Sequence, residues 1–189
     1  MTEGKALRLF VCVDLSDEAA EILGRVLVPW QERLPRARWV ARRKWHVTVR
    51  FLGRTQPDLL DFVEEACRGA AAEVEPFEVS LAGLGVFPGR TRARVLWTGV
   101  DDPRGALATL AAGLDRRLAP EFEPETRPFT PHMTVARFNP PEPFREHADA
   151  LDRTELGTDP WTIDRLLLYR SHLSPKGSEY ELLQSFPVG

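Results

Sequence analysis

Residues 46–51 read His-Val-Thr-Val-Arg-Phe, and residues 132–138 read His-Met-Thr-Val-Ala-Arg-Phe. The two stretches differ only in one apolar residue and in one alanine inserted in the second copy. They are separated by almost half of the 189-residue chain. This repeat predicts two related halves, each contributing one strand with the same pattern.

Each stretch has a polar face and an apolar face if it forms a β-strand, because side chains two positions apart then point the same way. His46 shares a face with Thr48, and His132 shares a face with Thr134. The opposite faces carry only apolar side chains, which are Val47, Val49, Met133 and Val135. A pseudo-two-fold axis between the halves would bring both polar faces together across a groove.

The rest of the chain alternates between strand-like and helix-like hydrophobic periods, with Pro and Gly between them. Strands are expected over 6–15, 37–40, 46–53, 77–86, 93–100, 132–138, 161–172 and 179–186; helices are expected from Asp17, Pro57 and Asp102 and over 144–151. Strands outnumber helices beyond what a βαβ alternation needs. The pattern therefore favours an α+β fold with mostly antiparallel sheets over a doubly wound parallel sheet.

The composition is that of a globular protein, with 43% hydrophobic and 28% charged residues. One folding unit over residues 1–189 is expected. The longest apolar runs are far shorter than the roughly 20 residues of a membrane span, and the N-terminal residues have no apolar signal-peptide core. We therefore expect a cytoplasmic protein without a membrane partner. Cys12 and Cys67 are expected to be buried free thiols, because two cysteines form no disulfide framework.

The net charge of −3 argues against a protein that coats long nucleic acids. Basic residues are nevertheless concentrated in two stretches without an acidic residue, namely Arg36, Arg38, Arg42, Arg43, Lys44, Arg50 and Arg54 in the first and Arg90, Arg92 and Arg94 in the second. These residues form either solvated loops and strand edges or an electropositive cleft that attracts phosphate. The position of His46 within the first stretch favours the cleft.

Two histidines with two threonines match the needs of phosphodiester opening, which uses a base, an acid and donors for the phosphate oxygens. Histidine suits both proton-transfer roles because its ordinary pKa is about 6.5. A zinc site is the main alternative use, but no third ligand lies three or four residues from either histidine. We therefore expect neither a metal nor another cofactor. His147 and His172 are expected to be structural or solvent-facing.

The paired motifs resemble the two signature tetrapeptides of the two-histidine (2H) phosphoesterase superfamily. Within it, nearly the whole chain is similar to the bacterial RNA 2′,3′-cyclic phosphodiesterase family, historically called 2′-5′ RNA ligase. Further matches are Phe-Leu-Gly at 51–53, Gly-Val-Phe-Pro at 85–88, Arg-Val-Leu-Trp at 94–97 and the ending 168–180.

The resemblance implies a pseudo-symmetric, two-lobed α+β fold with helices on the outer faces and antiparallel sheets flanking a central active-site cleft. It also implies metal-independent hydrolysis of a terminal 2′,3′-cyclic phosphate to a 2′-phosphomonoester. His46 would be the proton donor and His132 the proton acceptor, while Thr48, Thr134 and Arg137 would bind the phosphate. Strict alternation puts Arg137 opposite to His132, so a bulge or the strand's end has to turn it inward.

The expected partners are RNA ends or small cyclic nucleotides, bound by a monomer. Phe51 and Phe138 are the aromatic residues nearest to the motifs; they either stack on the terminal base or belong to the core. Two other functions remain open: the reverse reaction, which joins RNA ends through a 2′-5′ linkage, and a non-catalytic module that binds nucleotides or RNA ends. The presence of both histidines and both threonines favours the enzyme.

Overall fold

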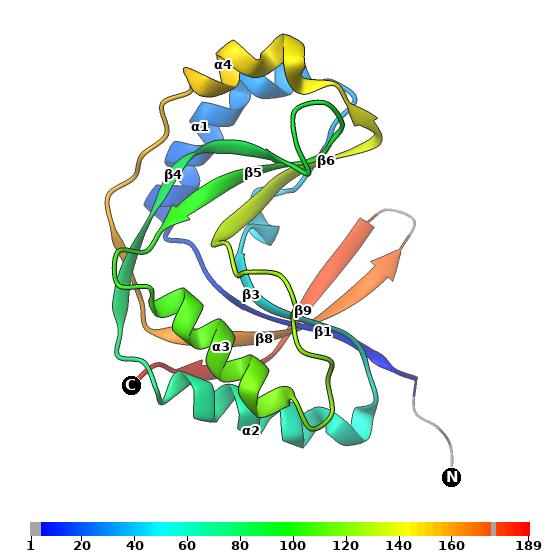
Figure 1. Ribbon diagram of the computed structural model, residues 1–189, viewed down its shortest axis with the longest axis vertical. Helices are drawn as coiled ribbons and strands as arrows, with labels where there is room; N and C mark the ends of the chain where they lie inside the picture. The colour runs from blue at the N-terminus through cyan, green and yellow to red at the C-terminus, as the bar shows by residue number, and fades with distance from the viewer. Residues whose placement is uncertain (1–4, 175–176) are drawn as a thin grey trace.

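The computed structural model describes residues 5–174 and 177–189. Within these residues the framework consists of two antiparallel sheets (Figure 1). The first has the order β3-β1-β8-β9, with β1 at Leu7–Val13, β3 at Val47–Thr55, β8 at Arg165–Ser174 and β9 at Gly177–Pro187. The second has the order β2-β6-β5-β4-β7, with β2 at Arg38–Trp39, β4 at Phe77–Phe87, β5 at Ala93–Asp101, β6 at His132–Glu142 and β7 at Trp161–Ile163.

The helices lie on the outer faces of the two sheets, as predicted (Figure 1). They are α1 at Asp17–Arg33, α2 at Leu60–Ala71, α3 at Ala106–Leu118 and α4 at Ala148–Asp152, with 3₁₀ turns at Arg42–Lys44, Pro57–Leu59 and Phe144–His147. Helices α2 and α3 pack against each other and against the four-stranded sheet, although α3 follows a strand of the five-stranded sheet. The α+β prediction with mostly antiparallel sheets is confirmed.

Local side-chain hydrogen bonds determine where two of the helices begin. Ser16 caps α1 as expected, because its hydroxyl accepts the N–H of Ala19 at 3.1 Å. Helix α3 begins later than its predicted start at Asp102. The Asp102 carboxylate instead accepts the N–H of Leu107 at 2.8 Å, and Gly105 adopts a left-handed φ of 66° between them.

The prediction of one strand over 161–172 is wrong, because Asp164 separates two strands that belong to different sheets. Strand β7 pairs with β4, whereas β8 pairs with β1. Pro57 begins a 3₁₀ turn, and α2 follows it only from Leu60. Of the predicted turn after Ser174, Pro175 and Lys176 lie outside the described residues.

The core joins side chains from both sheets and from the covering helices. Its fully buried members include Leu9, Leu23, Leu27, Leu81, Leu96, Leu107, Leu110, Leu114, Phe144 and Phe186. Cys12 and Cys67 are buried free thiols, as predicted. Burial raises the pKa of the Cys67 thiol to about 12, which keeps this group protonated and unreactive at neutral pH.

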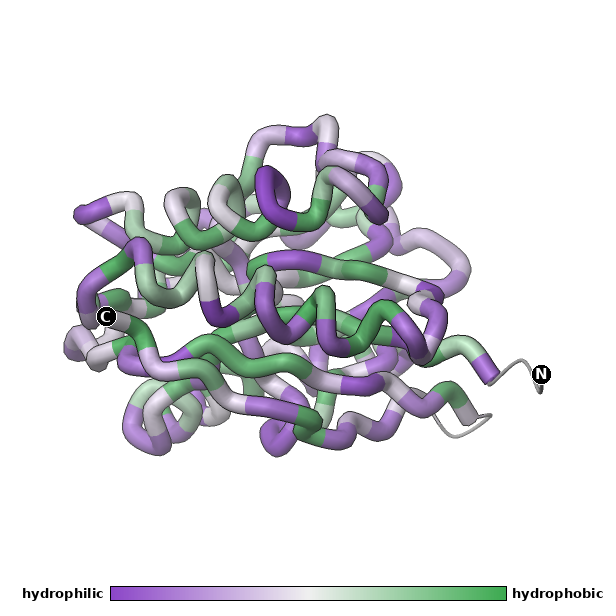
Figure 2. Tube along the Cα trace, turned by 90° about the horizontal axis from the view of Figure 1, so that it is seen from below, coloured by the Kyte–Doolittle hydropathy of each residue, from purple (hydrophilic) through white to green (hydrophobic). Residues whose placement is uncertain are grey.

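Hydrophobic and hydrophilic segments alternate along the trace when the molecule is viewed from the side of α2 and α3 (Figure 2). This is the pattern of amphipathic elements that cover a shared core. In the described part of the chain, no helix combines the length and the apolar character needed to cross a membrane.

Candidate active site

Both histidine strands contain a β-bulge at the same place in the repeated motif. The extra residue of β3, relative to β1, is Val49, and the extra residue of β6, relative to β5, is Val135. Each of these valines directly follows the threonine of its motif. A bulge changes the face on which the following side chains lie. The two halves therefore repeat a backbone irregularity as well as a sequence.

The bulge in β6 brings Arg137 to the same side of the strand as His132. Met133 and Val135 are buried, the next residue Ala136 is buried as well, and Arg137 is exposed. The positive charge of Arg137 also contributes to lowering the pKa of His46, after the larger effect of burial. Strict alternation would have put Arg137 opposite to His132, and the bulge in β6 turns it to the same side.

Phe51 occupies in β3 the position that Arg137 occupies in β6, two residues after the bulge. Its side chain is 47% exposed, and the Arg8 guanidinium lies 4.6 Å from the centre of its ring. Phe138, in contrast, is buried and packs against Phe144 with ring centres 5.4 Å apart. Of the two alternatives left open for Phe138, base stacking is therefore excluded, since its ring belongs to the core.

The two imidazoles have matching hydrogen bonds. Nδ1 of His46 lies 2.8 Å from the carbonyl oxygen of Lys44, and Nδ1 of His132 lies 2.7 Å from the carbonyl oxygen of Thr130. A carbonyl can only accept, so Nδ1 carries the hydrogen in both rings. This tautomer leaves both Nε2 atoms available for proton transfer.

Aromatic side chains hold the His46 ring. Its centre lies 4.8 Å from that of Phe10 and 5.4 Å from that of Tyr180, which meets it edge-on. Burial is the main cause that lowers the pKa of His46; the hydrogen bond to the Lys44 carbonyl opposes this effect, and the charge of Arg137 adds to it. The free protein therefore favours the neutral form of His46.

His132 has a comparable aromatic wall, formed by Phe87 at 5.2 Å and Trp97 at 6.3 Å between ring centres. These two rings also stack on each other at 4.9 Å. Gly85 lies opposite Trp97 in the sheet, and a Cβ at this position would come within 2.2 Å of the indole ring. The segments 85–88 and 94–97 thus build the wall beside His132. The sequence singled out both segments but did not reveal this role.

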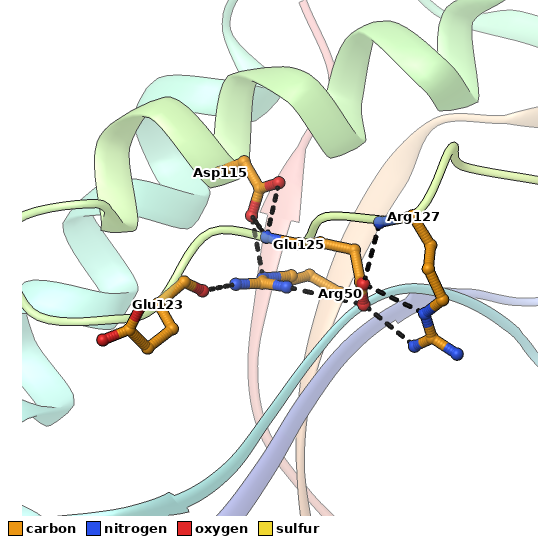
Figure 3. A network of polar contacts seen from close by, with 5 residues as sticks. All are labelled: Arg50, Asp115, Glu123, Glu125 and Arg127. Atoms are coloured by element: carbon orange, nitrogen blue, oxygen red, sulfur yellow. Dashed lines mark hydrogen bonds and ion pairs between the residues drawn. The ribbon is translucent and has the colours of Figure 1, made fainter.

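Arg50 connects the first histidine strand to the segment that leads to the second histidine (Figure 3). Its guanidinium lies 3.0 Å from the Asp115 carboxylate and 4.0 Å from the Glu125 carboxylate, and it donates to the Glu123 carbonyl at 2.5 Å. Hydrogen bonds from Arg127 are the main cause that lowers the pKa of Glu125 to about 2. The Glu125 carboxylate is thus ionised and can pair with Arg50.

Several basic side chains of the stretch around His46 have neighbouring partners. Arg42 donates to a backbone carbonyl at 3.0 Å, and Lys44 forms an ion pair with Glu179 at 2.7 Å, in which Arg43 also takes part. Arg90, from the second basic stretch, pairs with Asp152. The predicted electropositive cleft is therefore restricted to those arginines of the two basic stretches that form no ion pair within the described residues.

The other two histidines lie in structural or solvent-facing settings, as predicted. His147 packs edge-on against Trp30 and Phe144. His172 contacts the Glu181 carboxylate at 2.7 Å. In residues 5–174 and 177–189, no three His, Cys, Asp or Glu side chains form a group that could hold a metal ion.

Comparisons with known proteins show which chains this one resembles. Residues 16–175 match the family model described as the 2′-5′ RNA ligase superfamily. The RNA 2′,3′-cyclic phosphodiesterase of Methanothermobacter thermautotrophicus is 30% identical over 95% of this chain and 98% of its own length. The enzyme of the same name from Geobacillus stearothermophilus is 32% identical over 97% of this chain, which spans 58% of that longer protein.

Solved structures have the same fold. The crystal structure of a Thermus thermophilus protein matches with a TM-score of 0.78 at 28% identity, over 96% of this chain and 98% of that one. Escherichia coli LigT, crystallised with ATP, matches with a TM-score of 0.68 at 25% identity, over 98% and 99% of the two chains. The family match, the relatives and the two-sheet fold lead to one conclusion: the chain belongs to the 2′-5′ RNA ligase superfamily.

Proposed function

We propose that this protein hydrolyses the 2′,3′-cyclic phosphate at an RNA end to a 2′-phosphomonoester, with His46 and His132 as the two proton-transfer groups. The observation that carries the proposal is their matched geometry, in which each Nδ1–H donates to the carbonyl two residues earlier and each Nε2 is left available. The names of the relatives support this reaction class.

The reaction begins when a water oxygen attacks phosphorus and His132 Nε2 takes the water proton. The bond between phosphorus and the 3′ oxygen breaks, and His46 Nε2–H protonates this oxygen as it leaves. Thr48 and Thr134 donate to the non-bridging oxygens, and Arg137 neutralises their charge. The products are a 2′-phosphate and a free 3′ hydroxyl.

The role of His46 as proton donor requires the imidazolium, whereas burial and Arg137 favour the neutral ring in the free protein. A bound cyclic phosphate would bring a negative charge beside the ring and would pair with Arg137. Both effects raise the pKa of His46. The substrate thereby helps to protonate the group that later protonates its leaving oxygen.

An arginine pair supports phosphate binding on this face. Arg38 lies directly opposite Arg137 in the register of β2 and β6. Like charges opposite each other in a sheet repel, and a bound anion removes this repulsion. Phe51, whose ring is exposed on the other half, is proposed to stack on the terminal base.

Two other functions use the same site. Joining RNA ends through a 2′-5′ linkage needs the same acid and base in reverse, and water at high concentration favours hydrolysis. A module that only binds nucleotides would not need two imidazoles with available Nε2 atoms. Hydrolysis is therefore the preferred proposal. The monomeric state and the cytoplasmic location stay predictions.

The test is to incubate the purified protein in EDTA with 2′,3′-cyclic AMP and with an RNA trimer that ends in a cyclic phosphate, resolving 2′- from 3′-phosphate products. We expect only the 2′-phosphate. His46→Ala and His132→Ala should each lower kcat by about 10²-fold or more, whereas His147→Gln should retain the rate. A folded protein that binds the trimer but releases no product would establish the binding module instead.

A further inference from the structure

A second basic site lies beyond the histidine motifs, at the end of the four-stranded sheet where β1 begins. It is a cavity of about 290 Å³, and its lining contains no Asp or Glu. The basic side chains that line it are Lys5, Arg8, Arg54, Arg170 and His172. This cavity, the N-terminal basic pocket, has no part in the chemistry proposed above.

The N-terminal basic pocket and the histidine site share one face of the sheet. Arg8 and Phe10 are two positions apart on β1, so they point the same way. Phe10 packs against the His46 ring, and Arg8 lies over Phe51. Arg54 is the partner of Arg8 in the register of β1 and β3. Exposed Phe51 therefore lies between the imidazole and the two arginines.

The separation of the two sites follows from the strand geometry. Thr48 lies opposite Cys12, and Arg8 lies four residues before Cys12 on β1. A strand rises about 3.3 Å per residue, so the two levels are about 13 Å apart. A phosphate held beside Thr48 is thus too far away to contact Arg8 as well.

The charge of the pocket is only partly compensated. Arg170 and His172 both contact the Glu181 carboxylate, at 3.8 and 2.7 Å. Arg8 and Arg54 form no ion pair within the described residues. Two unpaired guanidiniums in a concave site attract an anion, and their planar donors suit phosphate oxygens.

We infer that the N-terminal basic pocket binds phosphodiester groups of the RNA chain on the 5′ side of the cyclic end. This inference rests on the proposed function. A cyclic mononucleotide has one phosphate, which the histidine site would hold, so a second anion on the same ligand has to be another phosphate of a longer chain. Guanidiniums that contact phosphates carry no base information, so the pocket selects chain length and not sequence.

The test compares kcat/KM for 2′,3′-cyclic AMP with kcat/KM for an RNA trimer ending in a 2′,3′-cyclic phosphate. The wild type should prefer the trimer by about 10-fold or more, the size expected for a hydrogen bond to a charged group. Arg54→Gln, alone and with Arg8→Gln, should reduce this ratio. Arg104→Gln removes the same charge from an exposed side chain that contacts Pro76, so the ratio should not change.

Equal kcat/KM values for both substrates in the wild type would overturn the inference while leaving the proposed hydrolysis intact, as would a ratio that Arg54→Gln does not change. If neither substrate is hydrolysed, the proposed function fails. The binding of a fluorescent trimer with a 2′-phosphate then tests whether the N-terminal basic pocket binds RNA phosphates. Arg54→Gln should weaken that binding and reduce the slope of log K against log salt by about 0.7, the value for one phosphate contact on a single strand. Unchanged affinity and slope would refute the pocket.

Discussion

The Arg50 guanidinium lies 3.0 Å from the Asp115 carboxylate and thereby joins strand β3 to helix α3. The side chain of Arg50 is only 10% exposed, and it also contacts the segment that precedes His132. A single side chain of the first motif thus supports the approach to the second. Arg50 therefore connects the strand of the first motif with the segment that leads to the second.

Arg50→Met should therefore lower both stability and activity. The substitution leaves Asp115 and Glu125 without their shared cation, and we expect the free energy of unfolding to fall by about 1–3 kcal/mol, because both carboxylates keep some contact with water. Chemical denaturation measures this change. Arg25→Met, which removes an exposed pair with Glu21, should change stability by less than about 0.5 kcal/mol. Equal effects of the two substitutions would contradict the role of Arg50.

Arg137→Gln should raise the pKa of His46 and lower kcat/KM. Removing the nearby cation favours the imidazolium, although burial continues to lower this pKa. An NMR titration of the labelled histidine rings reports the pKa directly, with Arg104→Gln as the control. The proposal for Arg137 fails if kcat/KM remains at the wild-type value while the pKa shifts.

The lowered pKa of His46 predicts how stability depends on pH. In the unfolded chain this histidine titrates near pH 6.5, and in the folded protein it titrates at a lower pH. Between these two values the unfolded state binds more protons, so the free energy of unfolding decreases as the pH falls through this window. Denaturation series should show a smaller decrease for His46→Gln. A variant with the wild-type slope would show that another group is responsible.

Phe51→Ala and Phe138→Ala should affect different properties, although each residue ends one of the two histidine motifs. Loss of the exposed Phe51 ring should raise KM for the RNA trimer by about 10-fold, since stacking on one base contributes about 1–3 kcal/mol, while stability changes little. Loss of the buried Phe138 ring should destabilise the protein by about 3–5 kcal/mol. Steady-state kinetics and thermal melts separate the two. An unchanged KM for Phe51→Ala would exclude stacking.

Gly85→Ala should impair catalysis without touching a proposed catalytic residue. The new Cβ would meet the Trp97 ring, which has to move together with the neighbouring Phe87 and the wall beside His132. We expect a lower kcat and a shifted tryptophan emission spectrum. Gly24→Ala is the matched control, since open space surrounds that position and alanine favours a helix. Wild-type kcat in Gly85→Ala would show that the wall is dispensable.

The sequence predicted the two histidine strands well because their information is local. Alternation of apolar and polar residues defines the faces, and the repeat predicts that His46 and His132 act together, which stays a prediction. The cap at Ser16 is equally local and was confirmed. Strict alternation alone puts Arg137 opposite to His132, so its predicted position depended on a bulge. The structure contains this bulge.

Features that depend on pairing between distant segments were not accessible in this way. The break at Asp164 depends on the different sheets that β7 and β8 join, which no periodicity reveals. The rings of Phe10 and Tyr180 reach His46 from β1 and β9. Glu179, far away in the sequence, neutralises Lys44 and thereby weakens a basic stretch that is uninterrupted in the sequence.

The residue that follows each bulge by two positions breaks the symmetry between the halves. It is Phe51 on the side of His46 and Arg137 on the side of His132. A nucleotide in this site would meet an apolar ring at one end and a cation at the other, and this difference would favour one orientation. That polarity would decide which ester oxygen faces His46, so the proposed hydrolysis would form a single regioisomer despite the near symmetry of the two motifs.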